Sequence, residues 1–305
     1  MNNTEFRKVY YFALFAVIFT FLLILAGSLV MSTGAGMTIP TWPLPSHFFP
    51  PFKGVLWFEY GHRILAGTDA VLTLILVISL WRFNFSKGVK WLGITALGAV
   101  FAQALLGGIT VLYGLPFDVS TAHAALAQVF FCLMVCLAYF TSGTSVKLQA
   151  PGSRIYSLKV LTLTTPLLIY VQILLGAFAR HLGTGLAIST FPLAFGQVFP
   201  PGLDMSFGVM VNFLHTRIGA LLVLFFVSGT SWLGWGFANL RKICQINIIL
   251  VVLQVFLGIG VVLTGKSILF TTAHVGVGTL LLALNFLLAI KVRMEFNPQV
   301  SEAVV

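Results

Sequence analysis

Charged residues are scarce in this chain, and acidic residues are the scarcest. Only 8% of the 305 residues are charged, with 17 Lys and Arg against 7 Asp and Glu, whereas about a quarter of the residues of a typical soluble domain carry charge. Hydrophobic residues make up 59% of the chain and the mean hydropathy is +1.03. This composition excludes an ordinary soluble domain and predicts an integral, multi-pass membrane protein of the all-α class.

Cysteine is also rare, and so few cysteines exclude a disulfide framework. The three cysteines are Cys132, Cys136 and Cys244, and none of them lies in an expected outer loop. We interpret them as small apolar residues of a packed bundle. The chain also lacks a basic patch with interleaved aromatic residues, so nucleic acid is not an expected partner.

Long apolar runs dominate the remainder of the sequence. A helix needs about 20 apolar residues to cross the hydrocarbon core of a bilayer, and eight windows of that kind occur. The predicted helices are Val9–Met31, His62–Arg82, Val89–Leu112, Thr121–Thr141, Leu158–Phe178, Asn212–Gly236, Ile243–Leu263 and Ile268–Ile290.

Basic residues gather on one side of the predicted bundle. Twelve of the 17 lie before the first helix, between helices 2 and 3, 4 and 5, or 6 and 7, or after helix 8: Arg7, Lys8, Arg82, Lys87, Lys90, Lys147, Arg154, Lys159, Arg241, Lys242, Lys291 and Arg293. The positive-inside rule therefore predicts that both termini are cytoplasmic.

The chain repeats itself, which indicates a tandem architecture. Residues recur after 151 or 153 positions in the pairs Gln103 and Gln254, His123 and His274, Glu59 and Asn212, and His62 and His215. Four helices per unit bring both units into the membrane from the same side, so we expect two tandem four-helix bundles related by a pseudo-twofold axis along the membrane normal. The predicted division is 1–145, a cytoplasmic linker 146–157 that contains Pro151-Gly152, and 158–305.

Four of the six histidines follow this repeat. His62, His123, His215 and His274 each open an even-numbered predicted helix, so they share one depth near the outer end. His47 and His181 fall in predicted outer loops without repeat partners, and we interpret them as ordinary loop residues, with gating of access as the alternative.

Four histidines in register favour haem ligation. Imidazole is a good axial ligand of haem iron, and a bundle interior can hold a flat macrocycle between facing side chains. One haem per half would use all four histidines. Zinc is disfavoured, because only Glu59 is near as a further ligand. An ion or proton pathway is an alternative, although few acids lie in the predicted membrane region.

The two halves differ at one acidic position. Glu59 lies three residues before His62, on the same helix face if that helix begins earlier, whereas Asn212 takes the place of the acid in the second half. The first half therefore looks catalytic and the second structural or electron-transferring, unless Glu59 only pairs with Arg63. Arg63 and Arg217 could bind haem propionates or snorkel to the interface. We interpret Asp69 as a buried structural acid, with a role in a polar path as the alternative.

Together these residues resemble the haem A synthase family over nearly the whole chain. The resemblance rests on the eight predicted helices, the duplication, and four motifs: Glu59-Tyr-Gly-His62-Arg63, Thr121-Ala-His123, His215-Thr-Arg217 and Thr272-Ala-His274. The segment Ser32-Thr-Gly-Ala-Gly-Met37, followed by Pro40-Thr-Trp-Pro43, is also similar to the first outer loop of that family.

The resemblance implies an oxidoreductase that converts a methyl group of haem O to the formyl group of haem A, through hydroxylated intermediates with oxygen from water, for haem-copper oxidase assembly. It implies that His62 and His123 bracket the substrate haem, that His215 and His274 ligate a resident haem b, and that Glu59 takes part in the chemistry. Haem O synthase, an unidentified electron acceptor and a second copy of the chain are possible partners, and the expected location is a bacterial inner membrane.

One departure concerns cysteine again. Some members of the family carry a cysteine pair in the first outer loop, whereas residues 34–60 contain none, so a thiol-based role there is not expected. A dihaem electron-transfer cytochrome linked to quinol remains the main alternative function. An ion transporter is the second alternative.

Overall fold

The computed structural model describes residues 3–43, 54–143, 153–200 and 206–296, and within these ranges the chain consists of helices and loops without a β-strand. Eight helical spans are long and apolar enough to cross a membrane. The prediction of an all-α chain with eight such helices is confirmed.

The spans follow one another along the chain as long helices. Their bounds are α1 Asn3–Ser32, α2 Leu56–Arg82, α3 Lys87–Leu112, α4 Phe117–Thr141, α5 Ser153–His181, α6 Phe207–Phe213, η1 Leu214–Gly219, α7 Ala220–Gly234, α8 Ala238–Leu263 and α9 Ile268–Phe296. The connections after α1 and α5 are the longest. The sixth span comprises α6, the π-helical turn η1 and α7.

Most helices begin earlier than hydropathy predicted. α2 begins at Leu56 rather than His62, so Glu59 and His62 do share one helix. α5 extends over Ser153–His181, which corrects two predictions: residues 153–157 are helical rather than linker, and His181 ends a helix rather than lying in a loop. Hydropathy misses these turns because a helix continues through polar residues, where it still satisfies its own backbone groups. Residues 144–152 of the predicted linker lie outside the described residues.

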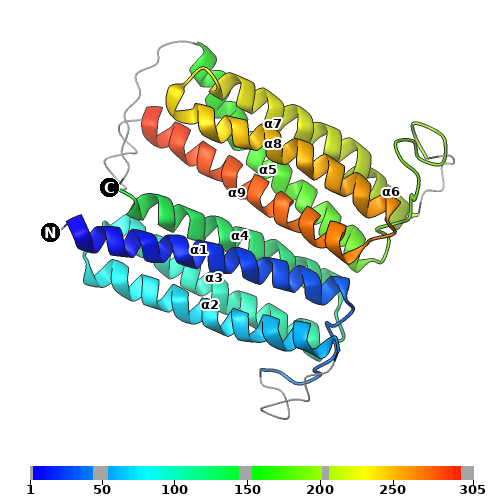
Figure 1. Ribbon diagram of the computed structural model, residues 1–305, viewed down its shortest axis with the longest axis horizontal. Helices are drawn as coiled ribbons and strands as arrows, with labels where there is room; N and C mark the ends of the chain where they lie inside the picture. Colours follow the sequence, from blue (N-terminus) through cyan, green and yellow to red (C-terminus); the bar gives the residue numbers. More distant parts are fainter. Residues whose placement is uncertain (1–2, 44–53, 144–152, 201–205, 297–305) are drawn as a thin grey trace.

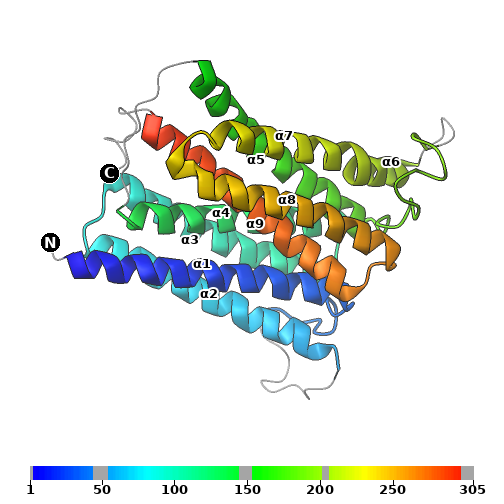
Figure 2. The ribbon, with the colours of Figure 1, turned by 45° about the horizontal axis from the view of Figure 1, so that its top comes forward.

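The helices contact one another in two groups of four spans. In the first group, α1 and α3 each pack on both α2 and α4. In the second group, α5 and α8 each pack on both α7 and α9. Figures 1 and 2 show the first group in blue to green and the second in green to red. α1 begins and α9 ends at one end of the bundle, and the loops after α1 and α5 lie at the other end (Figure 1).

The two groups meet through α1 and α4 on one side and α5 and α9 on the other. A Cβ atom at Gly276 of α9 would lie 2.7 Å from Leu25 of α1, so glycine permits this close approach. At the loop-bearing end, Arg180 of α5 donates hydrogen bonds to the Ser28 carbonyl at 3.0 Å and the Ser32 hydroxyl at 2.8 Å, both on α1.

Buried polar pairs also join neighbouring helices. Asn247 of α8 and Asn285 of α9 are both about fully buried, and the Asn285 amide donates to the Asn247 side-chain oxygen at 3.1 Å. Thr165 of α5 and Thr230 of α7 share a hydroxyl hydrogen bond of 2.7 Å. Such bonds select the helix register, because an amide or hydroxyl that lost its partner could not form a hydrogen bond to water in the hydrocarbon region.

We expect the amide pair to contribute measurably to stability. Asn247→Leu should lower the free energy of unfolding by about 1 kcal/mol, because it removes the amide partner of Asn285. Unfolding of Asn247→Leu, Asn285→Leu and the double variant in detergent micelles would form a double-mutant cycle. Strictly additive losses would show that the two amides do not interact.

Candidate functional site

The four repeated histidines lie on α2, α4, η1 and α9, each about two turns inside the span, and each ring packs against a glycine on the preceding span. A Cβ atom built on that glycine would lie closer to the imidazole Cε1 atom than an ordinary van der Waals contact allows. The pairs are Gly27 with His62 at 3.0 Å, Gly107 with His123 at 3.1 Å, Gly176 with His215 at 2.6 Å, and Gly258 with His274 at 3.0 Å. The missing side chain at each glycine is therefore what makes room for each ring.

Three of these glycines follow a glutamine by four residues, one helical turn away. The Gln103 side chain donates to the His123 carbonyl at 2.8 Å, and the Gln172 side chain donates to the His215 carbonyl at 2.5 Å. The Gln254 amide nitrogen lies 3.3 Å from His274 Nε2. Leu23 takes the corresponding place before Gly27, so the first site differs from the other three.

The second pair of histidines has a geometry that suits a shared metal. The rings of His215 and His274 have their centres 6.3 Å apart and their planes at 86°. Two imidazoles that bind one metal ion from opposite sides, at about 2.0–2.1 Å per metal–nitrogen bond, would have ring centres about 6 Å apart. His215 Nδ1 lies 3.0 Å from the Gln172 carbonyl oxygen, as in many metal-binding histidines whose second nitrogen donates to a backbone carbonyl.

The first pair also lies together. His62 and His123 are within electrostatic range of each other, and Nδ1 of each ring is buried without a hydrogen-bond partner. His181, at the end of α5, is within electrostatic range of His123. The structure thus brings a fifth histidine toward the first pair from the second group of helices, whereas His47 lies outside the described residues.

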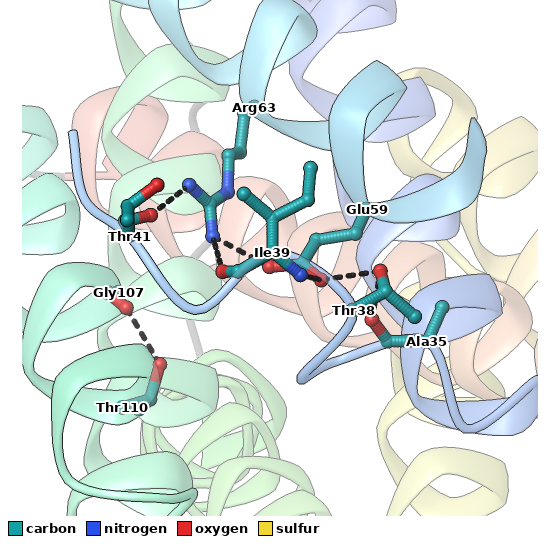
Figure 3. A network of polar contacts seen from close by, with 8 residues as sticks. All are labelled: Ala35, Thr38, Ile39, Thr41, Glu59, Arg63, Gly107 and Thr110. Carbon is teal, nitrogen blue, oxygen red and sulfur yellow. Dashed lines mark hydrogen bonds and ion pairs between the residues drawn. The ribbon is translucent and has the colours of Figure 1, made fainter. Parts of the chain in front are cut away.

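Glu59 is buried and fastens a loop. Its Oε2 accepts hydrogen bonds from the Thr38 hydroxyl at 2.6 Å and the Ile39 amide at 2.9 Å, and its Oε1 forms an ion pair with Arg63 at 2.6 Å (Figure 3). Arg63 also donates to the carbonyls of Ile39 at 2.7 Å and Thr41 at 2.5 Å. The pair binds the loop that follows α1 to the start of α2.

Asn212 and Arg217 bind the loop that follows α5 in a similar way. The Asn212 amide donates to the carbonyls of Thr184 at 2.9 Å and Gly185 at 3.0 Å. Arg217 donates to the Thr190 carbonyl and, at 2.5 Å, to the Thr216 hydroxyl. Its Nε is buried without a hydrogen-bond partner, and no carboxylate among the described residues pairs with it.

One extra residue distinguishes the second half here. His62 precedes Arg63 directly, whereas Thr216 separates His215 from Arg217. The turn Leu214–Gly219 is π-helical, and a π-turn is the usual way for a helix to absorb a single inserted residue. It lets His215 stay on Gly176 while Arg217 stays on the Thr190 carbonyl.

The remaining polar candidates have structural surroundings. Asp69 is fully buried and accepts a hydrogen bond from Thr20 of α1 at 2.9 Å, which links α1 to α2. Cys132, Cys136 and Cys244 are all buried and free, as expected for packing residues. Among the described residues, no group of three or more His, Cys, Asp or Glu side chains lies close enough together to hold a metal ion. The candidate ligands are therefore the histidine pairs.

The sequence reasoning missed two features of the site. It did not single out the four glycines or Gln172, although the spacing of glutamine and glycine recurs at Gln103, Gln172 and Gln254. It also missed a second loop repeat, in which Gly34-Ala-Gly-Met-Thr-Ile39-Pro-Thr-Trp-Pro43 matches Gly183-Thr-Gly-Leu-Ala-Ile188-Ser-Thr-Phe-Pro192 after 149 positions. A comparison of the chain with itself at that offset would have found the loop repeat and the pair Gly27 and Gly176, whereas Gly107 and Gly258 recur after 151 positions.

We expect Gly176 to be the most sensitive of the four glycines. Gly176→Ala should strain the site by about 1–3 kcal/mol, because the new methyl group would overlap the His215 ring. If His215 ligates haem, the haem content of the purified variant, measured as Soret absorbance per protein, should be about tenfold lower than that of the wild type. Gly229→Ala is the matched control, since a Cβ atom there meets nothing within 4 Å. Normal haem content in Gly176→Ala would contradict the role of this contact.

Comparison with known proteins supports one family. The sequence profile described as cytochrome oxidase assembly protein matches residues 49–286. A heme A synthase of Alkalihalophilus pseudofirmus is 28% identical, covering 84% of this chain and 86% of its own. Heme A synthases of Nitrosomonas eutropha, at 28% identity over 83% and 85% of the two chains, and Shouchella clausii, at 29% over 81% and 84%, are similarly related.

The matched residues run from before Glu59 past His274, so they include all four repeated histidines and both loop-binding arginines. From this match over most of its length, the chain belongs to the cytochrome oxidase assembly protein family.

Proposed function

We propose that this integral membrane protein is a haem A synthase, an oxidoreductase that converts a methyl group of haem O to the formyl group of haem A for haem-copper oxidase assembly. The observation that carries the proposal is the set of four half-buried histidines that pack on glycines of the preceding spans, in a chain whose relatives are named heme A synthase.

The residues of the second half suit a resident haem b. His215 and His274 would hold its iron, and the 6.3 Å between their ring centres supports this assignment. Ligation through His274 Nε2 requires the Gln254 amide, now 3.3 Å away, to turn aside. Arg217, with an unpartnered buried Nε, would receive a propionate. When bound, this haem supplies one-electron redox chemistry.

The first half would bind haem O as the substrate, between His62 and His123. Residues 1–145 then form the substrate half and residues 158–305 the cofactor half, with the connection between them on the cytoplasmic side. Arg63 suits a propionate less well than Arg217, because its guanidinium is already bonded to Glu59 and two carbonyls.

Glu59 is our candidate for proton uptake in the first half. Oxidation of a methyl group to a formyl group removes protons as well as electrons, and the oxygen comes from water, so a carboxylate near the substrate can accept protons. Glu59 lies one turn from His62 on α2. A proton on Glu59 would displace one of the three donors that now hold its carboxylate.

Location and partners follow from the same proposal. The bias of basic residues supports cytoplasmic termini, and the bacterial origin of the relatives supports a bacterial cell membrane. Haem O synthase would deliver the substrate, and an acceptor outside this chain would take the electrons. A second copy of the chain is a further possible partner.

Expression in a host that makes haem O but no haem A tests the proposal. Extraction of haems, followed by chromatography and mass spectrometry, should reveal haem A or its hydroxylated precursor in cells with the wild-type chain. Glu59→Gln should lower that yield by about 10²-fold or more if Glu59 is the proton acceptor.

Asp118→Asn is the matched control, because Asp118 is an exposed acid at the start of α4 whose side chain accepts a hydrogen bond from the neighbouring Val119 amide. Bound haem b without modified haem would instead support the dihaem electron-transfer cytochrome, and protein without haem would support a transporter.

A further inference from the structure

The loops after α1 and α5 share sequence and position but differ in what fastens them. We define the first strap as residues 33–43 and the second strap as residues 182–193. Each is held by the residue three before the histidine, Glu59 or Asn212, and by the following arginine. Both straps lie at the end of the bundle opposite the start of α1 (Figure 1).

Charge holds the first strap. The Glu59 side chain is 4% exposed and that of Arg63 is 16% exposed, so their ion pair is largely shielded from solvent. Glu59 accepts from the strap at Thr38 and Ile39, while Arg63 donates to the strap at Ile39 and Thr41. The strap therefore bonds to both members of one ion pair (Figure 3).

In the second strap a neutral amide takes the place of the carboxylate. Asn212 donates to Thr184 and Gly185, and its backbone carbonyl accepts at 2.7 Å from the Thr216 hydroxyl. That hydroxyl in turn accepts from Arg217, which also donates to the Thr190 carbonyl of the strap. Asn212 can neither gain nor lose a proton at ordinary pH. The inserted Thr216 takes the place that the carboxylate has beside Arg63.

We propose that Glu59 is a positioning residue as well as the candidate proton acceptor: its ion pair with Arg63 fastens the first strap, so the first site opens when the Glu59 charge is lost, whereas the second site stays closed. The consequence for haem rests on the proposed function: the first site exchanges its haem and the second site retains it.

The physical reason lies in the shared ion pair. Loss of one member of a buried ion pair leaves the other as an uncompensated charge, which is far more costly than loss of a neutral contact. Without the Glu59 charge, Arg63 would turn toward solvent and release the Ile39 and Thr41 carbonyls, and Glu59 would hold the Thr38 hydroxyl less strongly. No single proton can release the second strap in this way.

Hydrogen–deuterium exchange on the full chain in detergent, without added haem O, tests the fastening. In Glu59→Gln, the peptide over residues 33–43 should exchange about tenfold faster or more, because the Ile39 amide loses a charged acceptor, while the peptide over 182–193 stays unchanged. Asn212→Ala should give the reverse pattern. Glu59→Asp keeps the charge and should partly restore protection, and Asp118→Asn should change neither strap.

Unchanged exchange at 33–43 in Glu59→Gln would overturn the proposal. Equal acceleration of both straps would also overturn it, because that result indicates general destabilisation. Thr38→Val is the milder second variant if Glu59→Gln does not fold, and it should loosen the first strap alone.

Haem transfer to apomyoglobin tests the consequence. Glu59→Gln loaded with haem O should release it about tenfold faster than the wild type, with the release of haem b unchanged. Equal release of haem O from both proteins would refute the link between strap and exchange. Neither measurement requires turnover. If Glu59→Gln loosens the strap but the wild-type chain makes no haem A, the proposed function is disproved and the inference about the strap still holds.

Discussion

The contact between each histidine and a glycine of the preceding span is the constraint on which the rest of this structure depends. A ring can approach the backbone of a neighbouring helix this closely only where no Cβ atom is present, as at Gly176 beneath His215. Helices in a bilayer gain little from the hydrophobic effect when they associate, so packing of this kind and hydrogen bonds between helices define their positions. Four such contacts fix four rings at equivalent places in one bundle.

The end of the bundle that carries the straps is organised around these rings. The residues that fasten the straps lie within one turn of His62 and His215, so each loop is tied to the same helix that carries a histidine. The π-turn at Leu214–Gly219 accommodates Thr216, so His215 and Arg217 both keep their contacts. The corresponding places before His62 and His215 therefore differ in two respects: an amide stands where the first half has an acid, and one threonine is added.

Glu59 illustrates how structure changes the interpretation of a residue. Its place before His62 suggested a proton acceptor or a partner of Arg63, and the structure shows the ion pair together with two hydrogen bonds from the loop. A carboxylate held by three donors is well suited to positioning, and any proton that it accepts must weaken that hold. Under the proposed function, one side chain would therefore couple the chemistry of the first site to its conformation.

The sequence by itself determined the eight spans, the duplication and the four histidines in register, because hydropathy over about 20 residues and recurrence of residue types are properties of the chain alone. It could not determine where α2 and α5 begin or end, or that His181 closes a helix, because polar residues extend helices without an apolar pattern. Only the tertiary structure decided which glycine lies beneath each ring and that Glu59 and Asn212 bind the straps. Those contacts join residues 16 to 39 positions apart, and nothing local in the sequence specifies which of them will meet.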